Sequence, residues 1–93
     1  MVNENEEDRL YASKFWNQHQ TRGLRENMIE NIKTAEKGGS FSLFVSPIGI
    51  TKTDKEKLSA YRVLADEIGY KIGGFKFNKK SYTAQASIKK KHD

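Results

Sequence analysis

The C-terminal third of this chain alternates apolar and polar residues on both sides of a short polar segment, residues 78–81. Because successive side chains of a strand point to opposite faces, the pattern predicts two antiparallel strands, residues 71–77 and 82–89, joined by a four-residue turn. One face of this hairpin is apolar and the other polar, as in a sheet that packs on a core from one side only. The Gly73-Gly74 pair indicates a bulge or a close backbone approach in the first strand. The apolar row consists of Phe75, Phe77, Tyr82, Ala84, Ala86 and Ile88.

The same segment concentrates positive charge. Residues 71–93 hold seven lysines and one acid, whereas residues 1–8 hold four acids and no base; the whole chain has a net charge of +5. A cationic surface of this kind favours a polyanionic partner, and nucleic acid is the commonest one for a small protein. The seven lysines are Lys71, Lys76, Lys79, Lys80, Lys89, Lys90 and Lys91.

Two helices and a strand are predicted in the first half of the chain. Residues 5–18 are compatible with a helix whose first turn is acidic. Apolar residues spaced three or four apart predict a second helix from Leu24 to about Gly38. Residues 41–45 alternate as a strand, with Phe41, Leu43 and Val45 on one side and Ser42, Phe44 and Ser46 on the other.

The third helix is the most clearly marked element. Thr53 and Glu56 have the spacing of a capping box at its start, and Gly69 is a natural stop. Its predicted apolar stripe consists of Leu58, Tyr61, Leu64, Ala65 and Ile68. The opposite face is predicted to be solvated, and it consists of Lys55, Glu56, Ser59, Arg62, Asp66 and Glu67.

These elements predict one α+β domain in the order α-α-β-α-β-β, with a three-stranded antiparallel sheet that ends in the β-hairpin. Residues 1–4 are predicted to form a polar tail and residues 5–18 an N-terminal helix. Residues 23–89 are predicted to form the α+β domain, and residues 90–93 a basic tail.

The composition excludes several classes of protein. Without cysteine the chain can form neither a disulfide framework nor a thiolate metal site, which fits a reducing cytoplasm. No segment approaches the roughly 18 apolar residues that span a bilayer, so we expect no membrane partner. His19 and His92 lack metal-ligand or catalytic spacing, and the adjacent Asp66 and Glu67 cannot face each other as a working carboxylate pair. We therefore expect a protein that is not an enzyme and that uses no cofactor and no metal.

The polar face of the hairpin is the leading candidate for a binding site. Its lysines can neutralise phosphates, and its other polar side chains can bind phosphate oxygens or read base edges. Tyr82 can stack on an unpaired base, whereas Phe75 and Phe77 are expected to pack in the core. The alternative is that the lysines only solubilise an exposed hairpin. The predicted nucleic-acid contacts are Lys71, Lys76, Lys79, Lys80, Tyr82, Thr83, Gln85, Ser87, Lys89, Lys90 and Lys91, with Lys52, Lys55 and Arg62 of the third helix as secondary phosphate contacts.

From Leu24 onward, the order of elements resembles the single-stranded nucleic-acid-binding module named for its Arg-x-x-x-His motif. Residues 41–47, FSLFVSP, and residues 65–70, ADEIGY, are similar in character to this family. The places of the naming arginine and histidine fall on Leu58 and Arg62, so no site residue of that family is carried over. The order is also similar to that of a winged helix, with the hairpin as the wing. In contrast to a helix-turn-helix, residues 51–69 are predicted to form one helix instead of two short ones.

We therefore expect a non-enzymatic nucleic-acid-binding protein, with DNA favoured over RNA. It would act as a small regulator or accessory factor of the kind that phages and plasmids encode, through phosphate and groove contacts of the lysine-rich hairpin. The alternative is a protein-binding module or inhibitor. In that case Tyr11, Phe15 and Trp16 of the first helix would dock on a partner or on a second copy of the chain.

Overall fold

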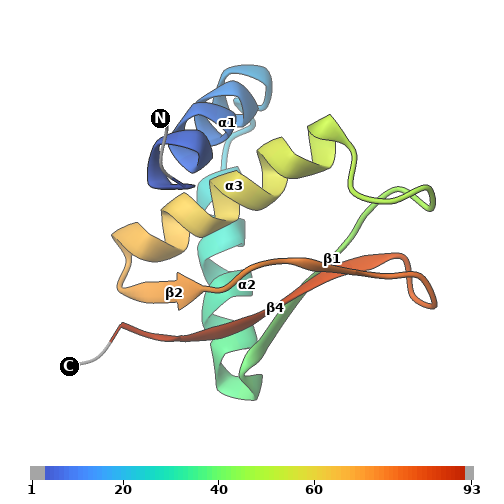
Figure 1. The fold of residues 1–93 in the computed structure, drawn as a ribbon. Helices are drawn as coiled ribbons and strands as arrows, with labels where there is room; N and C mark the ends of the chain where they lie inside the picture. The colour runs from blue at the N-terminus through green and yellow to red at the C-terminus, as the bar shows by residue number, and fades with distance from the viewer. Residues whose placement is uncertain (1–3, 92–93) are drawn as a thin grey trace.

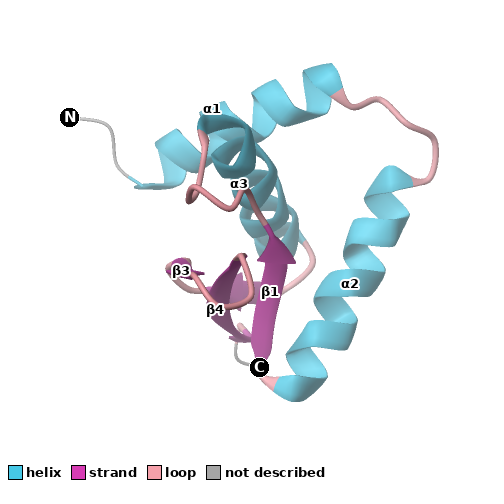
Figure 2. Ribbon diagram, turned by 90° about the vertical axis from the view of Figure 1, so that its right-hand side faces the viewer, coloured by secondary structure: helices cyan, strands magenta, loops and turns pink. Residues whose placement is uncertain are grey.

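In the computed structural model, which describes residues 4–91, the third helix lies over one face of an antiparallel sheet, the first helix packs on the third, and the second helix runs alongside the first strand (Figures 1 and 2). The α+β class and the antiparallel sheet predicted from the sequence are confirmed. Residues 1–3 and 92–93 of the predicted tails lie outside the described residues, whereas Glu4 belongs to the first helix and Lys90 to the last strand. In chain order the elements are α1 (Glu4–Gln18), α2 (Leu24–Gly38), β1 (Ser40–Phe44), α3 (Lys52–Glu67), β2 (Tyr70–Ile72), β3 (Lys76–Asn78) and β4 (Thr83–Lys90).

The last strand, β4, is the centre of the sheet. β1 pairs with residues 83–87 of β4, and β3 pairs with residues 83–85. Because both use the same part of β4, they lie on its two opposite edges. β2 pairs with residues 88–90 and continues the edge that β3 occupies. All three pairings are antiparallel.

The predicted strand at residues 71–77 is broken into β2 and β3, so the sheet has four strands instead of three. Gly73 lies so close to β4 that a Cβ atom there would be 2.8 Å from Ser87 Oγ. The Gly73 N–H donates to the Ser87 carbonyl at 2.9 Å, after which the chain leaves the ladder until Lys76. The glycine pair therefore provides the close approach indicated by the sequence, and it also interrupts the strand.

The core lies between the sheet, α2 and α3. The apolar stripe predicted for α3 is buried there except for Ile68, which is half-buried. The rings of Phe41 and Tyr61 pack with their centroids 4.9 Å apart, and this contact joins β1 to α3. Burial of each large side chain contributes roughly 1.5–3 kcal/mol. The buried set includes Met28, Ile32, Phe41, Tyr61, Leu64, Ala65, Ile72, Ala86 and Ile88.

The capping box of α3 uses Thr51 and Asp54, so the predicted pair of Thr53 and Glu56 is wrong. The Thr51 N–H donates to Asp54 Oδ2 at 3.1 Å, and the Asp54 N–H donates to Thr51 Oγ1 at 3.2 Å. Ser46 N–H also donates to Asp54 Oδ2, at 3.2 Å, which ties the loop after β1 to the helix start. Glu56 is instead buried, where it accepts a hydrogen bond from the last residue of α1 at 3.5 Å.

α1 packs on the face of α3 that was predicted to be solvated. Glu56 and Ser59 are consequently buried and not exposed. Asp8, Ala12 and Phe15 are buried too, and their spacing of four and three residues places them on one face of α1. The pattern within α3 could not reveal this, because a polar helix face is buried only when another element supplies polar partners for it.

Phe15 gives a test of this packing. It is 5% exposed, so Phe15→Ala should lower the free energy of unfolding by about 3 kcal/mol through lost burial and the cavity left behind. Leu10 lies on the same helix but is 57% exposed, and Leu10→Ala should change the free energy by less than about 0.5 kcal/mol. Urea denaturation followed by circular dichroism measures both. Two equally small effects would contradict the docking of α1.

The close approach at Gly73 gives a second test. Gly73→Ala should lower the free energy of unfolding by about 1–2 kcal/mol, because the new methyl group meets Ser87 Oγ. Ser87→Ala removes that oxygen, so the double variant should recover most of the loss. The four members of this double-mutant cycle are compared by the same denaturation. Strictly additive effects would show that the two residues do not meet.

Candidate nucleic-acid interface

The face of the sheet away from the helices has side chains from all four strands. Residues 84, 86 and 88 of β4 are buried in the core, so residues 83, 85, 87 and 89 point to the other face. Directly opposite residues of neighbouring strands point to the same face. The resulting set, here called the open face, consists of Ser40, Ser42, Phe44, Lys71, Lys76, Asn78, Thr83, Gln85, Ser87 and Lys89. None of these ten residues is acidic.

The lysines of the open face are exposed and lie in defined positions of the register. Lys76 lies opposite Gln85, which on its other side lies opposite Ser42, so one polar row crosses three strands. Lys71 and Lys89 lie directly opposite each other. Like charges in this position destabilise a sheet, and an anion bound between the two ammonium groups would remove the repulsion. The open face is therefore suited to phosphates.

The turn of the β3–β4 hairpin adds two exposed lysines, Lys79 and Lys80, at one end of the sheet (Figure 1). The turn begins after Asn78, one residue later than predicted. Asn78 Oδ1 accepts hydrogen bonds from the N–H groups of Lys80 at 2.9 Å and Ser81 at 3.4 Å. Asparagine shapes turns in this way. The two ammonium groups are thus carried by a defined turn.

Two exposed aromatic residues lie at the same end of the sheet. Tyr82 ends the turn with a φ of 53°, and its carbonyl accepts a hydrogen bond from Val45 N at 2.9 Å. Phe44, the last residue of β1, is 82% exposed, and Tyr82 is 48% exposed. Phe44 was not among the predicted contacts. The signal for it was the alternation of residues 41–45, which places this ring among the serines of the polar side.

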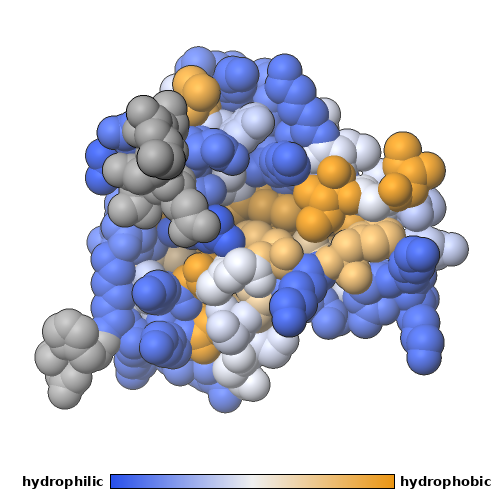
Figure 3. Space-filling view, viewed as in Figure 1, coloured by the Kyte–Doolittle hydropathy of each residue, from blue (hydrophilic) through white to orange (hydrophobic). Residues whose placement is uncertain are grey.

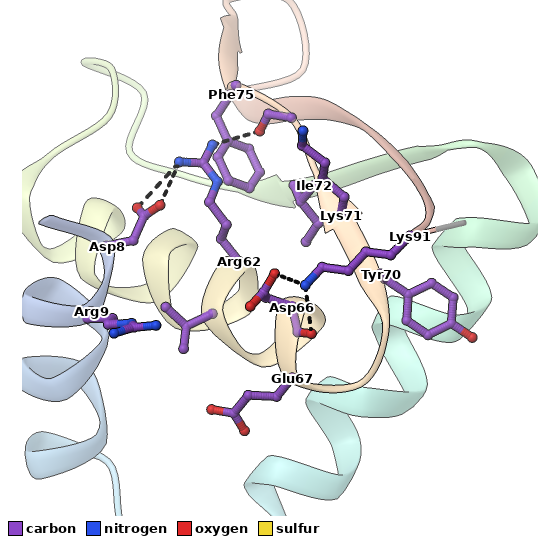
Figure 4. A pocket seen from close by; sticks show the side chains of 13 residues that line it. Asp8, Arg9, Arg62, Asp66, Glu67, Tyr70, Lys71, Ile72, Phe75 and Lys91 are labelled. Carbon is purple, nitrogen blue, oxygen red and sulfur yellow. Dashed lines mark hydrogen bonds and ion pairs between the residues drawn. The ribbon is translucent and has the colours of Figure 1, made fainter. Parts of the chain in front are cut away.

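Three predicted contacts lie elsewhere or are engaged within the protein. Thr83 is buried, and its hydroxyl lies 2.7 Å from that of Ser81. Lys90 is exposed but belongs to the alternate set of β4 positions that faces the helices. Lys91 forms an ion pair with Asp66 of α3 (Figure 4). The sheet therefore does not bring all the C-terminal lysines to one surface.

The predicted secondary phosphate contacts lie on the helical side. Lys52 and Lys55 are exposed in the first turn of α3. Arg62 instead donates from Nη1 to the Asp8 carboxylate at 3.1 and 3.3 Å, and from Nη2 to the Gly73 carbonyl at 2.6 Å (Figure 4). These donors of Arg62 join α1, α3 and the segment between β2 and β3, which gives the side chain a structural role.

The surroundings of Arg62 form a cleft of about 980 Å³ between the helices and β2. Its lining mixes both signs of charge, so it has no field that favours one kind of ion. Within residues 4–91, no group of three histidine, aspartate or glutamate side chains could hold a metal ion. Figure 3 shows that apolar residues gather between α3 and the sheet, with hydrophilic residues around them. The charged lining consists of Asp8, Arg9, Arg62, Asp66, Glu67, Lys71 and Lys91.

The aromatic residues of α1 pack mainly within the protein. Phe15 is buried, and its ring centroid lies 5.2 Å from that of Trp16 and 4.5 Å from that of His19. Tyr11 and Trp16 are half-buried. The three residues predicted for partner docking therefore do not form a fully exposed aromatic patch.

Comparison of the chain with family models, with curated proteins and with solved structures finds no match. Across residues 4–91, none of the helices combines the length and apolar character that membrane crossing requires. The residues of the open face and the turn are therefore the candidate nucleic-acid interface.

The ion pair of Asp8 and Arg62 gives a prediction about stability. Asp8→Ala should lower the free energy of unfolding by about 2 kcal/mol, less than the roughly 3–5 kcal/mol of a fully buried pair, because the Arg62 side chain is 29% exposed. Asp66→Ala breaks the more exposed pair with Lys91 and should cost less than about 1 kcal/mol. Thermal denaturation separates the two outcomes, since about 1 kcal/mol shifts the midpoint by roughly 4–8 °C. Equal shifts would contradict a structural role of Arg62.

Proposed function

We propose that this chain is a non-enzymatic nucleic-acid-binding protein that holds phosphates on its open face and on the hairpin turn. The observation that supports the proposal is the separation of charge: five exposed lysines stand on this surface, and none of the residues of the open face is acidic. A surface of one sign raises the local concentration of a polyanion and speeds its association. The five are Lys71, Lys76, Lys79, Lys80 and Lys89.

The mechanism combines phosphate neutralisation with polar contacts. The lysines bind phosphate oxygens, and Ser42, Gln85 and Ser87 offer hydrogen bonds between them. In a complex with a duplex, the β3–β4 hairpin would act as a wing, because a two-stranded ribbon fits the major groove of DNA. The deep, narrow major groove of RNA helices does not admit such a ribbon, which favours DNA over RNA among duplexes.

Lysines that only keep a sheet soluble need no separation from acids, and soluble surfaces usually mix both signs. In this protein the nearby acids of the C-terminal half lie on the helical side, and among the five lysines Lys71 also lines the cleft that holds Asp66 and Glu67. Asp66 pairs with Lys91, and Glu67 pairs with Arg25 of α2 at 3.4 Å. Solubility alone therefore does not explain the arrangement.

Replacement of three hairpin lysines tests this function. The variant Lys76→Ala/Lys79→Ala/Lys80→Ala should bind labelled DNA more weakly on every sequence. Its salt dependence should also be flatter, with the slope of log affinity against log salt reduced by about 2–3 for three lost phosphate contacts. Fluorescence anisotropy between roughly 50 and 200 mM salt measures both quantities.

The matched control removes three exposed lysines from the helical side, Lys33, Lys37 and Lys57. Both triple variants change the net charge from +5 to +2, since each loses three positive charges. The control should keep most of the affinity and the slope. Equal losses in the two variants would mean that only net charge matters, and they would refute a specific role of the hairpin.

A further inference from the structure

Phe44 occupies an unusual position for a phenylalanine. It ends β1 on the open face, directly opposite Thr83, and 82% of it is exposed. Its neighbours on the same face of β1 and β4 are the polar side chains Ser42 and Gln85. The ring stands on a paired strand, so its place is set by the sheet. Proteins that bind single strands combine exposed aromatic rings of this kind with a positively charged surface.

The charge around Phe44 selects among possible occupants. A protein partner would have to supply several acidic groups, whereas a nucleic acid carries a phosphate at every nucleotide. An aromatic ring stacks on the flat face of a base whatever its identity. In a duplex those faces are covered by neighbouring bases and become accessible only when a base is unpaired or flipped out. The ring therefore fits an unpaired base.

We infer that the occupant of the open face is a single-stranded nucleic acid, with one base stacked on Phe44 and its backbone crossing the open face. This rests on the proposed function and names its substrate class. The strand would pass from Phe44 over the row of Ser42, Gln85 and Lys76 toward the facing lysines at positions 71 and 89. From residue 83 to residue 89, β4 extends roughly 20 Å, which is enough for a few nucleotides.

Tyr82 can hold a second base at the same end of the sheet. Its carbonyl accepts a hydrogen bond from the N–H of Val45, the residue after Phe44, so the backbone holds the two aromatic residues close together at the end of the sheet. Half of Tyr82 is exposed, and the adjacent turn carries Lys79 and Lys80. Bases would stack at the end of the sheet where the lysine turn can bind their phosphates.

The experiment compares a labelled single strand of about 12 nucleotides with a duplex of the same sequence by fluorescence anisotropy. Wild-type protein should bind the single strand more tightly. Phe44→Ala should weaken binding to the single strand by about tenfold, with the duplex affinity and the salt slope unchanged, because the ring carries no charge. Phe44→Trp should retain the affinity. A fluorescent base analogue in the strand should be quenched by stacking on wild-type protein and not on Phe44→Ala.

Ile48→Ala is the control, because Ile48 is also exposed, at 88%, but lies in the loop after β1 and not on the open face. It should bind the single strand like wild-type protein. Circular dichroism should show that all three variants are folded, since none of these side chains is buried.

The outcomes separate the two proposals. If Phe44→Ala binds single strands as wild type does, while the hairpin triple variant is weakened, the stacking inference is overturned and the phosphate-binding function stands. Equal losses for Phe44→Ala and Ile48→Ala overturn it as well. If wild-type protein binds neither ligand at low salt, both proposals fail. If wild-type protein binds neither ligand but self-associates, and the Phe44→Ala variant does not self-associate, the ring is a contact between copies of the chain.

Discussion

An ion pair between the first and third helices holds together parts of the chain that are far apart in sequence. Asp8 accepts hydrogen bonds from Ser59 at 3.0 Å and from Arg62, and Arg62 also donates to the Gly73 carbonyl. That carbonyl belongs to the segment that has left the sheet, where a backbone oxygen needs a partner other than the ladder. Arg62 Nε is buried without a hydrogen-bond partner among the described residues, but the guanidinium lies 5.3 Å from the centroid of the Phe75 ring. Arg62 therefore joins the segment between β2 and β3 to α1 and α3, while the backbone ladder holds β3 beside β4.

The same arrangement separates the charges of the molecule. α3 lies over one face of the sheet with α1 packed on it, and α2 runs beside β1 (Figure 2). The acids of α1 and α3 that take part in ion pairs are bound among these helices and the end of β4 by Arg62, Arg25 and Lys91. The other side of the sheet keeps its lysines and has no acid among its ten residues. Charge complementarity, more than any cleft, is thus what supports a polyanionic partner. The exposed Phe44 adds an apolar contact that lysines cannot provide.

Much of the fold could be predicted from local patterns. Helical spacing located α2 and α3, and alternation located β1 and the hairpin, because these periods follow directly from helix and strand geometry. The errors have local causes. The spacing of a capping box occurs twice within six residues. The helix begins with Thr51 and Asp54 because the loop before α3 places Ser46 N–H against the Asp54 carboxylate. The glycine pair indicated a close approach, but the break of the strand over residues 73–75 is seen only in the folded sheet.

The sequence by itself determined the α+β class, the polar face of the hairpin and the concentration of lysines there, since each depends only on the order of residues along one strand or helix. Only the tertiary structure decided which residues share a surface. It buried Glu56 and Ser59 under α1, drew Arg62 inward to Asp8, and left Phe44 exposed beside the lysine turn. The physical reason is that side-chain direction follows from local geometry. Solvent exposure and charge partners depend instead on which distant segment packs against each face, and no local pattern encodes that choice.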